Sequence, residues 1–214
     1  MRSLKLTHSR DISFTSKQIQ ILETFLWLCT REGVGKITLQ KVAKSMNISL
    51  GSVHYHFDGK KSPNLLESAI VYVAQESFKY IRYNIEETEK SNEFKGIDSY
   101  VKTLFEWAEL KTHHYLYWLY FYYLSTFNET YRTVNMKYLK LMRNRIKTLL
   151  KHSIDIGLYK EFKISDERIK HLHSLIIGSL LLAGCDPSHK AFLHQQKYAI
   201  HGCQNLIQSY IRSS

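Results

Sequence analysis

The chain has 214 residues, of which 44% are hydrophobic, and this is enough apolar material to form a buried core. A chain that is disordered throughout is therefore excluded. Thirty Lys and Arg stand against nineteen Asp and Glu, and the formal net charge of +11 favours a polyanionic partner such as nucleic acid or an acidic membrane surface. Residues 1–62 hold ten basic and four acidic side chains, so +6 of this charge lies in less than a third of the chain.

The cysteines and the apolar runs indicate the compartment. Cys29, Cys185 and Cys203 are an odd set without C-x-x-C spacing, which suits a reducing environment better than a disulfide-bonded secreted protein. Residues 1–12 lack the continuous apolar stretch of a signal peptide. The most apolar runs, 115–127 and 175–183, fall short of the roughly 20 residues that span a bilayer. We expect a cytoplasmic protein that does not bind or cross a membrane.

The first predicted helix covers residues 17–32 and is followed by Gly33, which is placed to end it. Its apolar residues recur at intervals of three and four and form one stripe: Ile19, Leu22, Phe25, Leu26 and Cys29. Two prolines and nine glycines in the whole chain, together with the absence of alternating β-branched segments, predict an all-α fold.

Residues 38–57 have the pattern of two short helices joined by a tight turn. Thr38 can cap the first helix, Asn47 tolerates the left-handed backbone of a turn, and Ser49 can cap the second helix. In the second helix, residues 50–57, the spacing directs Leu50, Val53 and Phe57 inward. The opposite face then carries the short polar and aromatic side chains that a helix-turn-helix presents to the major groove: Gly51, Ser52, Tyr55 and His56.

A long helix is predicted from Pro63 to Glu89, where proline suits the first helical position. Five more helices are expected, broken near Gly96, Asn128, Gly157 and residues 186–187. They cover residues 94–110, 113–127, 130–157, 165–185 and 188–211. We therefore expect two domains: residues 1–62 with an N-terminal arm and a helix-turn-helix, and residues 63–214 with a larger helical domain for ligand binding and dimerisation.

Residues 37–43 (ITLQKVA) and 48–57 (ISLGSVHYHF), followed by Lys60, resemble the DNA-binding domain of the tetracycline-repressor (TetR) family. The resemblance covers roughly residues 14–70 and implies a homodimeric repressor of transcription that binds double-stranded operator DNA and is released by a small-molecule effector. By position it implies these DNA contacts: Thr38, Gln40, Leu50, Gly51, Ser52, His54, Tyr55, His56, Lys60 and Lys61. The alternative is that residues 38–57 are two core helices without a DNA role. The basic residues in 1–10 could form a minor-groove arm or a solvated tail.

Aromatic residues are dense between positions 107 and 127, more than one helical stripe can bury. Aromatic walls suit a flat, apolar or cationic ligand, and the candidate ligand-binding residues are Trp107, Trp118, Phe121, Tyr122 and Met136. The alternative is that the rings pack on one another as core.

The segment 172–183 combines Leu and Ile with small residues, which permits a neighbouring helix to approach closely. The TetR resemblance implies that the last two helices form the dimer interface. The candidate dimer residues are Leu175, Ile176, Ser179, Leu180 and Ala183. The same stripe could instead be core of a single subunit.

No Gly-rich phosphate loop, nucleophile elbow or metal-spaced His/Glu set is found, so we expect no enzyme activity and no cofactor. Adjacent His113 and His114 do not face the same way on a helix, so no metal site is predicted. Two other functions stay open: a ligand-independent architectural DNA-binding protein and, less favoured, a helical small-molecule enzyme.

Overall fold

The computed structural model describes residues 13–57, 64–186 and 188–213. These residues form α-helices and one short 3-10 helix without any strand, so the predicted all-α fold is confirmed. No helix in the described ranges combines the length and the apolar character that crossing a membrane requires. The elements in chain order are α1 (Ser16–Glu32), η1 (Val34–Lys36), α2 (Leu39–Ser45), α3 (Leu50–His56), α4 (Leu65–Lys90), α5 (Ile97–Leu110), α6 (Thr112–Phe127), α7 (Glu129–Asp155), α8 (Asp166–Cys185) and α9 (His189–Arg212).

Local capping explains where the helices begin and end. Thr15 accepts a hydrogen bond from the Gln18 amide and Gln18 bonds back to the Thr15 backbone, which starts α1 with a capping box. Gly33 ends α1 with φ of 85°. Helix α4 begins at Leu65, after Asn64 as N-cap. This is two residues later than predicted, and Pro63 lies outside the described residues, as does the expected domain boundary between 62 and 63.

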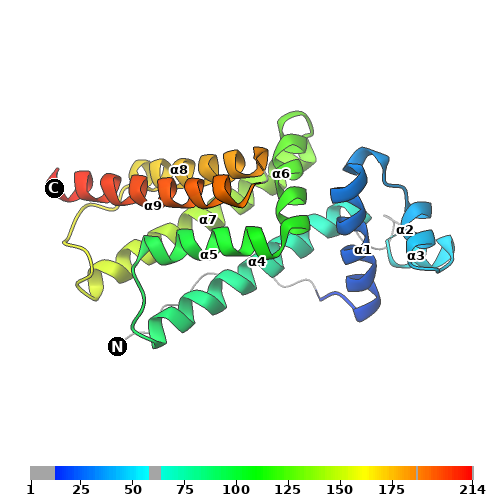
Figure 1. The fold of residues 1–214 in the computed structure, drawn as a ribbon, viewed down its shortest axis with the longest axis horizontal. Coiled ribbons are helices and arrows are strands. Elements are labelled where there is room, and N and C mark those ends of the chain that lie inside the picture. The colour runs from blue at the N-terminus through cyan, green and yellow to red at the C-terminus, as the bar shows by residue number, and fades with distance from the viewer. Residues whose placement is uncertain (1–12, 58–63, 187, 214) are drawn as a thin grey trace.

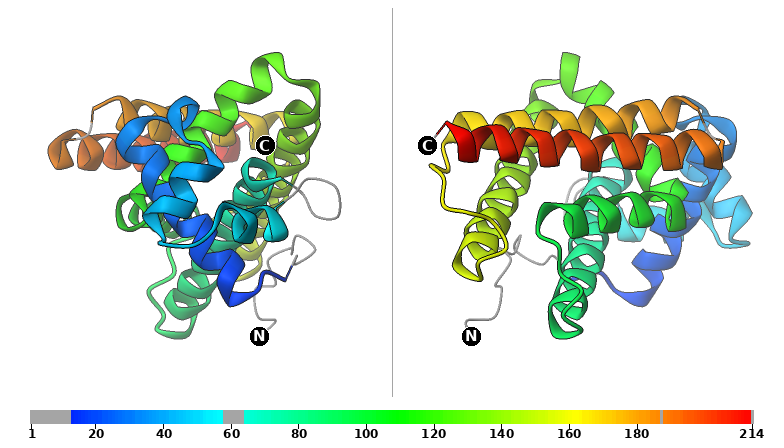
Figure 2. Two further views of the ribbon diagram at one scale, coloured as in Figure 1. Left: turned by 90° about the vertical axis from the view of Figure 1, so that its right-hand side faces the viewer. Right: turned by 60° about the vertical axis from the view of Figure 1, so that its left-hand side comes forward.

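The helices form two packed groups (Figure 1). Helices α1, α2 and α3 lie at one end of the molecule, and the remaining helices form a bundle beside them. Helix α1 contacts α2 on one side and α4 and α6 on another, so it joins the two groups. Helices α8 and α9 run side by side along one edge of the bundle (Figure 2).

These contacts alter the predicted buried stripe of α1. Ile19 is exposed, whereas Ile21 and Leu28, which the stripe omitted, are buried. A single stripe of residues describes a helix that packs on one neighbour, but α1 packs on three other α-helices and on η1. Its buried face is therefore wider than periodicity alone predicts.

Tyr117 of α6 contacts the first group of helices and the start of α4. Its ring packs edge-on against Phe25 of α1, with 5.6 Å between centroids. Its hydroxyl donates a hydrogen bond of 2.9 Å to the Leu66 carbonyl at the start of α4. One buried side chain thus connects α1, α4 and α6.

Candidate nucleic-acid interface

Helix α3 has an inner face and an outer face. Val53 and the following Phe57 are buried, as predicted. Leu50 was predicted to be buried with them, but it stands at the first helical position and is 39% exposed. Tyr55 is 82% exposed, and its ring meets the His56 ring edge-on at 5.1 Å between centroids. The outer face therefore presents aromatic and apolar groups to a partner.

The other residues predicted on α3 are all at least partly accessible to solvent. Gly51 and His54 are exposed, while Ser52 and His56 are half-buried. None of the four is enclosed in the subunit core. The helix can therefore approach a duplex without unfolding.

The turn before α3 is built as the sequence predicts. Asn47 has φ of 53°, in the left-handed region. The Ile48 amide then donates a hydrogen bond of 3.0 Å to the Ala43 carbonyl of α2. Ser49 caps α3 by accepting a hydrogen bond of 3.1 Å from the Ser52 amide. These bonds fix the angle between α2 and α3.

Helix α2 places two further predicted contacts at the surface, since Thr38 and Gln40 are both exposed. Thr38 accepts a hydrogen bond of 3.2 Å from the Lys41 amide, so its hydroxyl proton remains available to a phosphate. Lys41 pairs with Glu32 of α1 at 2.6 Å, and this hydrogen bond lowers the pKa of Glu32. The predicted phosphate contacts Lys60 and Lys61 lie outside the described residues.

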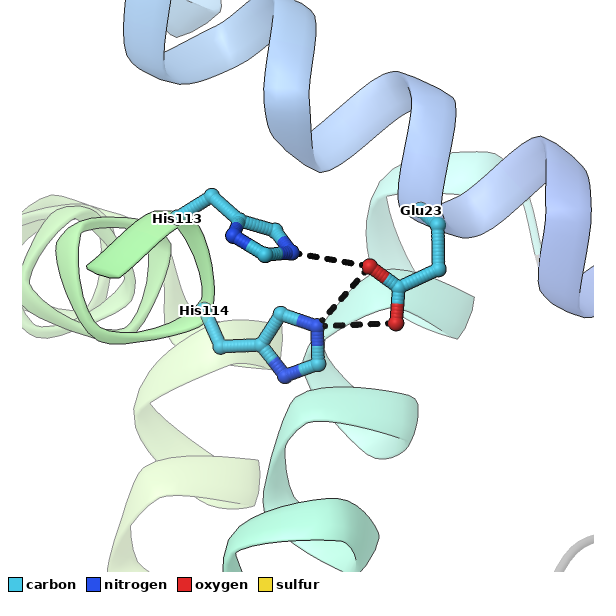
Figure 3. Close-up of side chains that lie close together, drawn as sticks. All are labelled: Glu23, His113 and His114. Carbon is cyan, nitrogen blue, oxygen red and sulfur yellow. Dashed lines mark hydrogen bonds and ion pairs between the residues drawn. The ribbon is translucent and has the colours of Figure 1, made fainter. Parts of the chain in front are cut away.

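Where α1 meets the bundle, the Glu23 carboxylate forms hydrogen bonds with three side chains of other helices. His113 and His114 of α6 direct their Nε2 atoms at its carboxylate, at 2.8 Å and 3.1 Å (Figure 3). The Tyr72 hydroxyl of α4 donates to the same group at 2.6 Å. Adjacent histidines were not expected to face one way, but the two rings meet edge-on with 4.5 Å between centroids, and both Nε2 atoms reach the carboxylate of another helix.

Burial would raise the pKa of the Glu23 carboxyl, yet the hydrogen bonds from His113, His114 and Tyr72 outweigh it and hold that pKa far below its usual range. Glu23 is therefore a fixed negative charge at the junction of α1, α4 and α6.

The five candidate ligand residues do not form one wall. Trp107 and Phe121 are buried, and Trp118 and Tyr122 are half-buried and in contact, with 4.5 Å between ring centroids. Met136 is exposed and lines a different feature, an open groove of about 620 Å³ between α7 and α8. Five cationic side chains border this groove: Lys137, Lys140, Arg143, Lys147 and Lys170.

Arg145 of α7 is a buried cation that the sequence analysis missed. It is 2% exposed, and its guanidinium lies 4.0 Å from the centre of the Phe78 ring. Its Nε and Nη1 atoms have no hydrogen-bond partner among the described residues. Burial lowers its pKa, although a guanidinium remains charged. The signal was available, because Arg145 stands between Met142 and Leu149 on the apolar stripe of α7.

The candidate dimer residues lie mostly inside the subunit. Ile176, Ser179, Leu180 and Ala183 are buried, and the Leu180 carbonyl accepts a hydrogen bond from the Tyr115 hydroxyl. Leu175 is half-buried. The exposed apolar residues of α8 are instead Leu181 and Leu182. The helical periodicity predicted the apolar stripe of α8, but this stripe is buried in the core of the single subunit.

A three-helix unit with a presented α3, joined to a helical bundle, is the architecture of helix-turn-helix regulators. A TetR transcription regulator from Haloarcula marismortui matches with a TM-score of 0.74 at 16% identity, over 92% of this chain and 99% of the other. A transcriptional regulator from Rhodococcus sp. Rha1 matches with a TM-score of 0.68 at 16% identity, over 93% and 97%.

A further match is a protein from Saccharomonospora viridis, named as a transcriptional regulator and solved in complex with choline. Its TM-score is 0.64 at 20% identity, over 88% of this chain and 95% of the other. No protein-family model and no curated protein matches the sequence. The chain has the fold of TetR transcription regulators.

Proposed function

We propose that this protein is a TetR-family transcriptional regulator that binds a specific double-stranded operator as a homodimer and represses transcription. The observation that carries the proposal is the exposure of Tyr55 on α3. Val53 on the same helix and Phe57 directly after it are buried and hold the helix against the core. Such a rigid outward helix next to a capped α2 is what reading of the major groove requires. The net charge of +11 supports attraction to phosphate.

The test is binding of the full chain to the DNA upstream of its own gene, measured by fluorescence anisotropy. Tyr55→Ala should weaken binding by about tenfold or more, the loss expected for one base-edge contact. Tyr83→Ala is the matched control, because Tyr83 is also an exposed helical tyrosine but lies on α4. Equal losses in both variants would contradict a recognition role for α3.

Competition with random DNA distinguishes the architectural alternative. A sequence-specific regulator should keep its operator complex in an excess of random duplex, since specific binding is typically at least about a thousandfold tighter. If random duplex competes as well as operator, and the affinity follows salt alone, the protein is an architectural DNA-binding protein.

We propose that the dimer forms through the exposed faces of α8 and α9. Leu181 and Leu182 of α8 and Leu193 and Tyr198 of α9 are large exposed apolar side chains on this helix pair. A second copy with the same face can bury them about a two-fold axis. Leu182→Glu should shift the sedimentation coefficient toward the monomer, and Leu158→Glu, at another exposed leucine, should not. A dimer that survives Leu182→Glu unchanged would contradict this interface.

We propose that the effector carries an anionic group that Arg145 receives. A carboxylate matches the guanidinium fork with two parallel hydrogen bonds, and the Nε and Nη1 atoms of Arg145 have no other acceptor among the described residues. Besides burial, the charge of Arg82 lowers the pKa of Arg145, so the surroundings of this guanidinium are electropositive. A cation such as choline, which the Saccharomonospora viridis protein binds, would be repelled here.

The effector class is tested with 1-naphthoate, its neutral alcohol and choline as probes. We expect 1-naphthoate to quench the intrinsic tryptophan fluorescence and to release the operator, which requires that it favour the state with low DNA affinity. Arg145→Met, which keeps the length of the side chain and removes the charge, should abolish the quenching. Stronger quenching by choline than by 1-naphthoate would reverse the assignment.

A further inference from the structure

Glu23, His113 and His114 bring three metal-binding atoms together at the junction between α1 and α6 (Figure 3). Each residue offers one ligand atom, and the three atoms lie within 4.8 Å of one another. We propose that these residues bind one divalent transition-metal ion of the zinc class. The ion would join the helix-turn-helix unit to the bundle.

The separations suit coordination after a small adjustment. The Nε2 atom of His113 lies 2.8 Å from Oε2 of Glu23, and Nε2 of His114 lies 3.1 Å and 3.2 Å from the two carboxylate oxygens. Zinc bonds to nitrogen and oxygen are about 2.0–2.2 Å long, so donors in a tetrahedral shell stand roughly 3.3–3.6 Å apart. Displacements below about 1 Å, with loss of the Nε2 protons, would replace hydrogen bonds with metal bonds.

The surroundings orient the ligands. Tyr72 donates a hydrogen bond of 2.6 Å to Oε1 of Glu23, which is the outer-shell support that metal-bound carboxylates usually have. The Tyr72 ring also packs against the His114 ring, with 5.5 Å between centroids, and His114 is completely buried. Two of the three ligands are therefore held in place by the fold.

The cluster is also open on one side. The side chains of His113 and Glu23 are 27% and 33% exposed. An ion can therefore enter, and water can occupy its fourth position. Two imidazoles and one carboxylate favour zinc and related first-row ions over Mg²⁺ and Ca²⁺, which prefer all-oxygen sites.

An ion at this position would affect the DNA-binding unit. Glu23 belongs to α1, which packs against α2, whereas the histidines belong to α6. A bound ion would hold α1 against α6 and so favour one orientation of α3. This consequence rests on the proposed function, whereas metal binding itself does not.

The test uses the full chain without a histidine tag, stripped with EDTA and titrated with Zn²⁺ against a chromogenic chelator. We expect one ion per subunit. Removing a ligand should cost at least as much as an outer-shell change, so Glu23→Gln and His113→Gln should each weaken binding by at least about tenfold. Co²⁺ should give the visible absorption of a tetrahedral complex in wild type and lose it in both variants.

The chain has eleven histidines, and histidines outside the site could bind Zn²⁺ weakly. His189→Gln is the matched control for such binding. His189 contacts Glu109 at 2.5 Å, a histidine–carboxylate pair that is not part of a three-residue group in the described ranges. This variant should bind Zn²⁺ as wild type does. His113 is substituted because it is partly exposed, whereas a change at the buried His114 would also disturb the core. Thermal unfolding without metal checks that Glu23→Gln and His113→Gln are folded.

The outcomes separate the two proposals. Absence of stoichiometric Zn²⁺ binding, or Glu23→Gln binding as tightly as wild type, overturns the metal site and leaves the three side chains as a hydrogen-bonded cluster. Zn²⁺ binding that needs Glu23 and His113, in a protein that binds no operator, supports the site and refutes the proposed function. If both hold, Zn²⁺ should change operator affinity in wild type and leave it unchanged in Glu23→Gln.

Discussion

His173 should make the protein less stable in mild acid. This histidine of α8 is buried, and its Nε2 atom has no hydrogen-bond partner among the described residues. Burial, and secondarily the charge of Arg143, lower its pKa from 6.5 to about 4. Because the folded state resists protonation and the unfolded state does not, its contribution to stability is complete above pH 6.5. It is lost as the pH falls from 6.5 toward 4.

The size of the effect follows from the two pKa values. Between pH 7 and pH 5, a shift from 6.5 to about 4 removes about 2 kcal/mol from the free energy of unfolding. This is a large part of the stability of a typical domain. His173→Leu removes the titrating group, so the variant should lack this part of the acid loss.

The assay is urea unfolding of wild type and His173→Leu at pH 7 and pH 5, at one protein concentration because dimerisation would add stability. The exposed His171 on the same helix gives the control, and His171→Gln should lose as much stability in acid as wild type. An equal acid loss in wild type and His173→Leu would refute the argument from burial.

Three further predictions concern stability in urea at pH 7. Arg145→Met should raise the free energy of unfolding by about 1–3 kcal/mol. The reason is that desolvation of the buried guanidinium destabilises the fold by more than its contact with Phe78 stabilises it. A less stable variant would contradict this and indicate a further partner of Arg145. Gly96→Ala should lower the free energy of unfolding by about 2 kcal/mol or more, because Gly96 has φ of 64° and an added methyl group would overlap the Tyr159 hydroxyl. Gly35→Ala is the control, since a methyl group there meets open space, and it should change the stability little. Thr38→Ala should cost about 1 kcal/mol through loss of the α2 cap, and Thr38→Ser should retain it; equal stability of the two would show that the cap contributes nothing.

Much of the helix-turn-helix could be predicted because its determinants are local. The caps at Thr38 and Ser49 and the left-handed turn at Asn47 act within about four residues of chain. The inward positions Val53 and Phe57 follow from helical spacing. The exposure of Tyr55 on the opposite face then follows as well.

Tertiary packing decided the features that involve distant helices. The spacing of Ile176 and Leu180 would be the same in a helix that packs inside its own subunit and in one that packs on a second subunit. Only the packing of the whole chain shows that they are buried in the subunit core. His113 meets Glu23 across 90 positions of sequence, which no local pattern encodes. The sequence by itself determined the helices, the caps at Thr15, Thr38 and Ser49, and the spacing of the apolar residues, because these depend on short-range hydrogen bonds and periodicity. The structure decided which stripe meets which neighbour, because that depends on how all the helices fill space together.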